Sequence, residues 1–178
     1  MAAQNRSPKV RRLAQMGLLF ALAMALSFLE SLLPALPMLP PGIRLGLSNI
    51  VTMYALFVLG SVSGYTIAVL KSLFVLLTRG AVAAAMSMAG GIASVTVMLL
   101  LSLLPGMKKQ CLLLSIFGGA AHNMGQLVAA RFIINNQYVW YYLPVLLAAG
   151  LLMGAITCLL YTSPSPRDGS RSRMPSSA

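Results

Sequence analysis

The stretch PMLPPGIRLGLSNIVT, residues 37–52, joins a long apolar run on its N-terminal side to a shorter apolar run on its C-terminal side. Its prolines and Gly42 predict a loop, because proline lacks the backbone donor that a helix requires. Arg44, Ser48 and Asn49 follow where the second apolar run begins. A cation and an amide at the mouth of a membrane helix indicate a binding site covered by a structured lid.

The composition of the chain indicates a membrane protein. Of its 178 residues, 58% are hydrophobic and only 8% are charged, which is too apolar for an ordinary soluble domain. The net charge of +11 does not indicate nucleic acid binding, because the basic residues lie mostly at the ends of apolar runs. The basic start continues directly into a segment long enough to span a bilayer, without an A-x-A cleavage site, so we expect no cleavable signal.

Apolar runs separated by short polar breaks predict an all-α integral membrane protein. We expect a basic cytoplasmic arm over residues 1–12 and a six-helix membrane domain over residues 13–157. The predicted transmembrane helices cover residues 13–33, 45–59, 62–78, 81–104, 111–134 and 143–157. The basic arm and Lys108–Lys109 fall on one side of the membrane in this arrangement, so the positive-inside rule places both termini in the cytoplasm.

The last 21 residues, 158–178, differ in character from the rest of the chain. CLLYTSPSPRD resembles the translation of a transposase-type sequencing-library adapter, and SRMPSSA resembles the other half of that adapter. We therefore expect an artefactual, disordered tail and a membrane domain that is truncated near Thr157. The alternative is a genuine tail rich in serine, proline and arginine.

One face of the first predicted helix carries small residues. Gly17, Ala21 and Ala25 share a stripe at four-residue spacing, which allows another helix to approach closely in lipid. Glu30 lies on the opposite face and would point into the protein. The stripe is compatible with docking of a partner protein and equally with ordinary packing inside the bundle.

Ionisable and hydrogen-bonding side chains inside apolar segments predict a substrate site, because such groups are costly at membrane depth. Glu30 and Arg44 could also reach the interface, whereas Lys71 lies in mid-span. His122, Asn123 and Gln126 share one helical arc and need partners, either other helices or a ligand. Donors and cations outnumber acids in this set, which favours a small anionic substrate such as a carboxylate or phosphate. The candidate substrate-binding residues are Glu30, Arg44, Asn49, Lys71, His122, Asn123 and Gln126.

Four segments carry a resemblance to a known family: PPGIRLGLSNIVTMYALFVLG, SFLESLLP before it, SMAGG, and AHNMGQL. Over about residues 10–157 the chain resembles the Gx transporter family, also labelled heptaprenyl diphosphate synthase component I. That family is similar to the substrate-binding S components of energy-coupling factor (ECF) transporters. The most specific part of the resemblance is the loop together with the second predicted helix.

The resemblance implies a six-helix S-component-like bundle in the bacterial cytoplasmic membrane, with an outward first loop that closes over the substrate. It implies that Ala21 and Ala25 contact a transmembrane coupling subunit, which links to a pair of ATPases. Lys71 stands where the family leads us to expect an arginine. The cationic character is kept, but bidentate recognition is not.

The family label suggests a prenyl diphosphate synthase, but the chain lacks the acidic residues that this chemistry requires. Such enzymes hold diphosphate through magnesium ions bound by aspartate-rich motifs, whereas Glu30 is the only acidic residue before position 158. The chain also lacks a Walker-type phosphate-binding loop. We therefore expect no enzymatic activity, no cofactor and no metal site.

Three functions remain open. The first is the substrate-binding subunit of a transporter energised by partner subunits. The second is a non-catalytic membrane component associated with a heptaprenyl or polyprenyl diphosphate synthase subunit. The third, which we favour least, is a free-standing proton-coupled carrier that uses Glu30 and His122.

Overall fold

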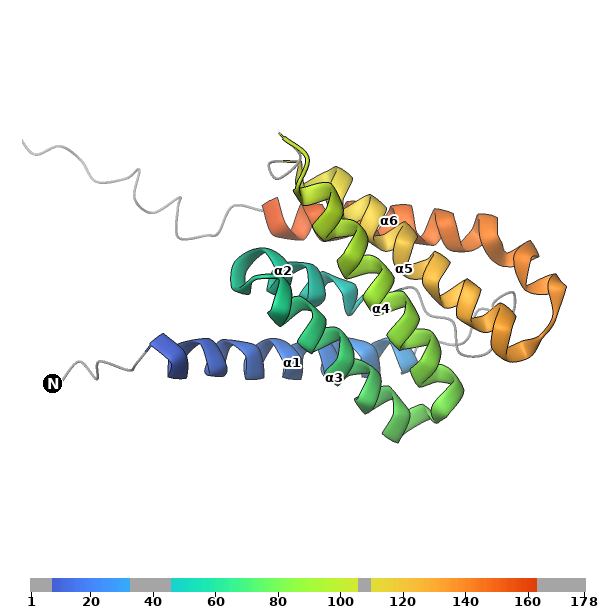
Figure 1. Ribbon diagram of the computed structural model, residues 1–178, viewed down its shortest axis with the longest axis horizontal. Coiled ribbons are helices and arrows are strands. Elements are labelled where there is room, and N and C mark those ends of the chain that lie inside the picture. The colour runs from blue at the N-terminus through green and yellow to red at the C-terminus, as the bar shows by residue number, and fades with distance from the viewer. Residues whose placement is uncertain (1–7, 33–45, 106–109, 163–178) are drawn as a thin grey trace, which may run out of the picture.

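The computed structural model describes residues 8–32, 46–105 and 110–162 (Figure 1). These residues form helices and short connections, with no strand among them. The elements are α1 (Pro8–Leu32), α2 (Asn49–Leu59), α3 (Ser61–Arg79), α4 (Ala81–Ser102), α5 (Cys111–Ile134), the 3-10 helix η2 (Gln137–Tyr142) and α6 (Leu143–Thr162). The proline-rich loop, Arg44 and most of the C-terminal tail lie outside the described residues.

Five of the described helices are long and apolar enough to cross a membrane: α1, α3, α4, α5 and α6. Their positions agree with five of the six predicted spans. The second predicted span differs, because its helix, α2, begins only at Asn49 and has 11 residues. A helix of that length is about 16 Å long, roughly half the thickness of a bilayer core.

Single glycines make the turns on either side of α3. Gly60 separates α2 from α3 with φ of 96°, and Gly80 separates α3 from α4 with φ of 88°. Residues that have a Cβ atom rarely adopt φ values in this region. One glycine therefore suffices to reverse the chain between α2 and α3, because α3 begins at the next residue, Ser61.

Close backbone contacts hold α4, α5 and α6 together. A Cβ atom on Gly125 would lie 2.8 Å from the carbonyl oxygen of Ala89 in α4, and one on Gly119 would lie 2.6 Å from that of Gly150 in α6. A Cβ on Gly154 would lie 2.6 Å from Cα of Ile116. The hydrophobic effect does not drive helices together within lipid. Close packing of small residues therefore contributes to the attraction between these helices.

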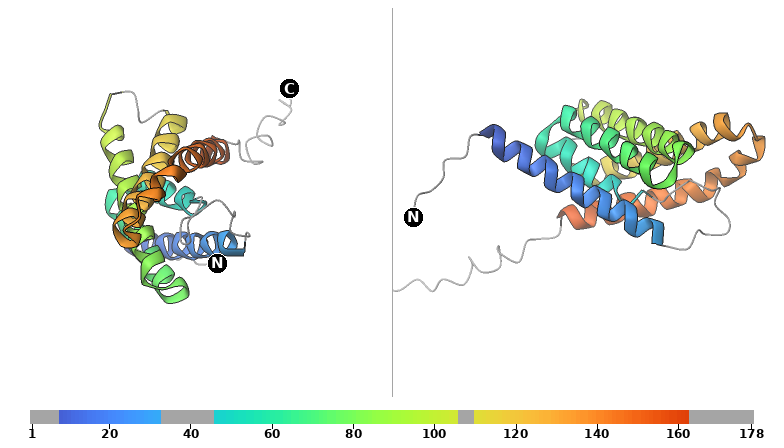
Figure 2. Two further views of the ribbon diagram at one scale, coloured as in Figure 1. Left: turned by 90° about the vertical axis from the view of Figure 1, so that its right-hand side faces the viewer. Right: turned by 90° about the horizontal axis from the view of Figure 1, so that it is seen from below.

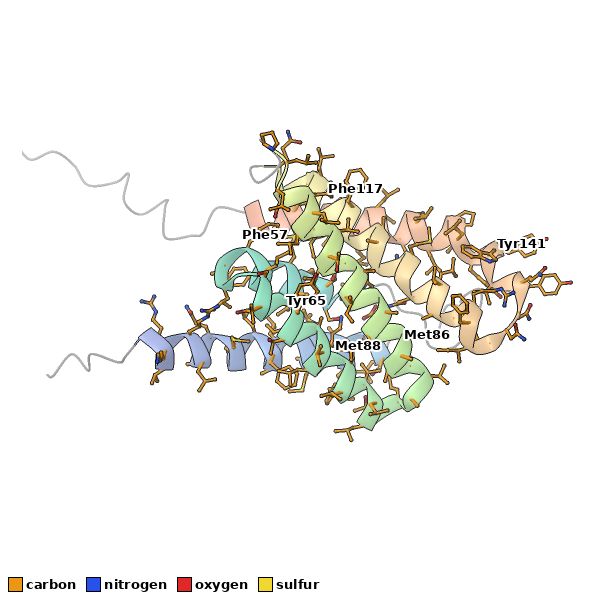
Figure 3. All side chains as sticks on the ribbon, viewed as in Figure 1. Phe57, Tyr65, Met86, Met88, Phe117 and Tyr141 are labelled. Atoms are coloured by element: carbon orange, nitrogen blue, oxygen red, sulfur yellow. The ribbon has the colours of Figure 1, made fainter. Side chains whose placement is uncertain are left out.

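The helices form a layer that curves around α2 (Figures 1 and 2). α3 packs against α4, α4 against α5, and α5 against α6, while α1 packs against α2 and α3. The first turn of α1 and the last turn of α6 lie toward the same end of the molecule (Figure 1). Tyr141 marks the opposite end, where η2 leads into α6 (Figure 3), and its ring stacks on that of Tyr138 with 6.0 Å between centroids.

Candidate functional site

Glu30 ties the C-terminal end of α1 to the chain that enters α2. The backbone N–H of Gly46 donates a hydrogen bond of 2.6 Å to Oε1 of Glu30, and the Glu30 side chain is buried. Gly46 has φ of 88°, and a Cβ there would lie 3.1 Å from Cδ2 of His122 in α5. A glycine at position 46 therefore lets the chain lie against His122 on one side and Glu30 on the other.

His122 and Gln126 lie one turn apart on α5 and are both buried. Nε2 of Gln126 lies 2.7 Å from Nε2 of His122. An amide nitrogen only donates, so Nε2 of His122 accepts, and a neutral imidazole then carries its proton on Nδ1. Gly90 allows this arrangement, because a Cβ there would lie 2.8 Å from Cγ of Gln126.

A small polar cavity of about 20 Å³ lies between α1, α3, α4 and α5. Glu30 interacts electrostatically with both Lys71 and Arg79, two turns apart on α3. Lys71 is only 3% exposed, whereas Arg79 at the end of α3 is exposed. The polar residues that line this cavity are Ser27, Glu30, Ser48, Lys71, Arg79, Ser87, His122 and Gln126.

A second cavity of about 10 Å³ adjoins the first, since both are lined by Gly46 and His122. Its remaining lining comes from Asn49, Met53, Met98, Ser115, Gly119, Met153 and Gly154. We refer to the first as the polar cavity and to the second as the methionine-lined cavity. Together they form the candidate site.

The structure brings four of the predicted site residues together at the polar cavity: Glu30, Lys71, His122 and Gln126. Asn49 lies at the methionine-lined cavity instead, where its Oδ1 accepts a hydrogen bond of 3.1 Å from Ser94.

Asn123 lies away from both cavities. Asn123 lines neither cavity, and its Nδ2 donates a hydrogen bond of 2.5 Å to the carbonyl of Leu146 in α6. It therefore joins two helices. Arg44 lies outside the described residues.

Arg79 and three serines were missed by the sequence interpretation. Arg79 follows Lys71 by eight residues, and Val75 between them also lines the polar cavity, so the three share one face of α3. Ser27 precedes Glu30 by three residues in the same way. Helical spacing from Lys71 and from Glu30 was the signal that could have found Arg79 and Ser27, whereas Ser87 lies on α4, where no site residue was predicted.

The small-residue stripe of α1 faces away from the rest of the described chain. Gly17, Ala21 and Ala25 are all exposed, and a Cβ on Gly17 would have no atom within 4 Å. Buried contacts of α1 come from another face, where Leu19 and Ala23 pack with Val51, Ala55 and Ile67. Internal packing against the described residues therefore does not explain the stripe.

Comparisons with known proteins agree with this fold. The structure is similar to a solved one described as "Structure and mechanism of the S component of a bacterial ECF transporter", with a TM-score of 0.72 and 21% sequence identity. The similarity covers 93% of this chain and 99% of the other. A search of curated proteins gives no match.

A family model identifies the chain at the level of sequence. The model described as heptaprenyl diphosphate synthase component I matches residues 19–163. This confirms the resemblance drawn from the loop, the second helix and AHNMGQL. The interpretation of residues 158–178 as a translated adapter stays a prediction. The chain is a multi-pass, all-helical membrane protein that belongs to the heptaprenyl diphosphate synthase component I family.

Proposed function

We propose that this protein is the membrane-embedded substrate-binding subunit of a transporter, that its substrate is a small anionic molecule, and that partner subunits energise it. The observation that carries the proposal is the polar cavity, where Lys71 and Arg79 face the single carboxylate of Glu30. The overall similarity to an S component supports the same function.

The charge balance around the polar cavity favours an anion. Lys71 and Arg79 contribute two positive charges and Glu30 contributes one negative charge, so a bound carboxylate or other singly charged anion would bring the site to neutrality. Serine hydroxyls and the amide of Gln126 add neutral hydrogen-bonding groups. Charge-assisted hydrogen bonds to an anion are strong where water is excluded, as it is around Lys71.

The chain direction is compatible with six crossings and two cytoplasmic termini in the bacterial plasma membrane. The predicted cytoplasmic end of α1 carries Arg12, whose Nη2 donates a hydrogen bond of 2.7 Å to the carbonyl of Leu59 at the end of α2. A cation at a helix C-terminus is favourable.

The exposed stripe of Gly17, Ala21 and Ala25 is the proposed contact with an ECF-type coupling subunit and its ATPases. An uncovered face of small residues permits close approach of a partner helix in lipid. Hydrolysis of ATP would then take place on the partners.

The name of the matched family keeps one alternative open: a non-catalytic membrane component associated with heptaprenyl or polyprenyl diphosphate synthesis. Co-purification from the native host distinguishes the two proposals. Recovery of a coupling subunit with ATPases supports the transporter, and recovery of a soluble, aspartate-rich synthase supports the alternative.

The direct test of the transporter proposal is ligand binding to the purified full chain in lipid nanodiscs. Small carboxylates and inorganic phosphate would be titrated by calorimetry, alongside neutral and cationic compounds of similar size. We expect only anions to bind, and Lys71→Ala to weaken their binding by about tenfold or more, since a charged hydrogen bond contributes about 1.5–3 kcal/mol.

Two variants control this test. Lys9→Ala removes an exposed lysine near the start of α1 and should leave binding unchanged. Lys71→Arg keeps the charge and should retain most of the affinity. Binding of neutral or cationic compounds alone, together with an unaffected Lys71→Ala variant, would contradict the proposal.

A further inference from the structure

The methionine-lined cavity differs from the polar cavity in the side chains that form its wall. Met53 of α2, Met98 of α4 and Met153 of α6 bring three thioethers to one place from three different helices. Two glycines of the α5–α6 contact, Gly119 and Gly154, also line it, so part of its wall is bare backbone. The wall is therefore soft, polarisable and mostly without charge.

Two polar side chains of this cavity, Ser115 and Asn49, hydrogen-bond to protein partners, whereas Nδ1 of His122 has no hydrogen-bond partner among the described residues. Oγ of Ser115 donates to Sδ of Met53 at 3.0 Å, and Oδ1 of Asn49 accepts from Ser94 at 3.1 Å. The side chains of the three methionines supply the rest of the side-chain surface beside Asn49, Ser115 and His122. Such a surface favours an apolar group over one that is hydrated.

The two cavities meet at Gly46 and His122, which line both of them. One end of the combined site thus holds Lys71, Arg79 and Glu30, and the other end holds the thioethers. Methionine alone often fills irregular gaps in a core. Here the thioethers border a charged cavity directly, so one molecule could contact both.

Methionine side chains also explain how the site could admit more than a water molecule. The cavities measure about 20 and 10 Å³, well below the few hundred Å³ of an ordinary ligand site. Methionine is unbranched and has three rotatable side-chain bonds, so it can change rotamer at low cost. Met153 is only half-buried, which gives it room to move.

We propose that the substrate is an amphipathic aromatic acid, with its carboxylate or phosphate in the polar cavity and its planar ring among Met53, Met98 and Met153. Sulfur atoms make favourable contacts with aromatic rings, particularly at ring edges, and Gly119 and Gly154 add no side chain to their part of the wall. This inference rests on the proposed function and specifies its substrate class.

The test is a matched series of singly charged carboxylates titrated against the full chain in nanodiscs: lactate, hexanoate, benzoate and 2-naphthoate. We expect the aromatic acids to bind at least tenfold more tightly than lactate and more tightly than hexanoate. Met153→Gln keeps the length of the side chain but makes it polar, and it should reduce the ratio of benzoate to lactate affinity at least threefold.

Met88→Gln is the matched control, because Met88 is a half-buried methionine of α4 that lines neither cavity (Figure 3). It should leave the ratio unchanged. Met98→Leu provides a second variant that keeps a similar apolar volume and replaces the thioether with a branched hydrocarbon; it should lower the affinity for benzoate more than that for hexanoate.

The outcomes separate the two levels of the proposal. Equal affinities for lactate and benzoate, both abolished by Lys71→Ala, would overturn the aromatic class and leave the anion site standing. A ratio that survives both Met153→Gln and Met98→Leu would also overturn it. If no carboxylate binds in a way that depends on Lys71, both the proposed function and this inference would be contradicted.

Discussion

Helices α5 and α1 both contribute to the candidate site, but they are held in different ways. α5 packs against α4 on one side and α6 on the other, through glycines that bring backbones into contact. α1 packs less extensively, against α2 and α3. Hydrogen bonds near its two ends, from Arg12 to Leu59 and from Gly46 to Glu30, add to that contact.

This difference in packing indicates that α5 and α1 have different roles in the bundle. α5 supplies His122 and Gln126 from a closely packed position, because its glycines bring its backbone against α4 and α6. α1 supplies Glu30 on one face and leaves the stripe of Gly17, Ala21 and Ala25 uncovered on another. α1 thus contacts the candidate site through Glu30 and presents an exposed face through the stripe. A helix with both contacts is suited to couple a structural change at the site to a proposed partner protein.

The largest effect is expected from adding a methyl group at the α5–α6 contact. Gly154→Ala places a Cβ 2.6 Å from Cα of Ile116, which is backbone and cannot move aside. Overpacking of this kind costs about 1–3 kcal/mol, so the thermal unfolding midpoint in detergent should fall clearly.

Gly17→Ala is the matched substitution on α1, where the added methyl meets no atom within 4 Å. Alanine is the better helix former by about 1 kcal/mol, so stability should stay the same or rise. Equal losses from the two substitutions would refute the contrast between the helices.

An intermediate effect is expected from removing one side-chain hydrogen bond of α5. Asn123→Ala deletes the buried donor to the carbonyl of Leu146, which should cost about 1–2 kcal/mol. Arg12→Ala deletes an exposed donor of α1 and should cost about 0.5 kcal/mol. Thermal unfolding of both variants in one detergent compares them, and a larger loss from Arg12→Ala would reverse the assignment of the rigid helix.

A substitution on the small-residue stripe of α1 is expected to have the smallest effect on stability. Its effect on assembly with a partner should be the largest. Ala21→Leu adds bulk to an exposed position, so the isolated protein should unfold at an unchanged temperature. Co-purification with an ECF-type coupling subunit should drop strongly, because backbones can no longer approach. Ala85→Leu, on an exposed face of α4, is the control and should leave assembly intact.

Much of the fold followed from hydropathy, because a bilayer demands long apolar helices. The bounds of α5, Cys111–Ile134, coincide with the predicted span. The start of α2 was placed four residues too early. Leu47 lies in a turn before α2 and has the same hydropathy there as in a helix, so composition does not reveal where the helix begins.

Part of the candidate site could also be predicted, since buried ionisable groups are rare and stand out in apolar segments. Glu30, Lys71, His122 and Gln126 line the polar cavity together, and their role in substrate binding stays a prediction. Asn123 and Gln126 looked alike in sequence, yet Asn123 turns to α6 and Gln126 to His122. Arg79 looked like a loop residue because it ends an apolar run.

The amino-acid sequence alone determined that this chain is a helical membrane protein, which residues are polar at membrane depth, and where small residues form a stripe. These properties depend on transfer of side chains into lipid and on helical periodicity, both of which are local. Only the tertiary structure decided which polar side chains share a cavity and that three methionines border it. Those neighbours come from different helices, and their meeting depends on how glycines set the approach of α4, α5 and α6.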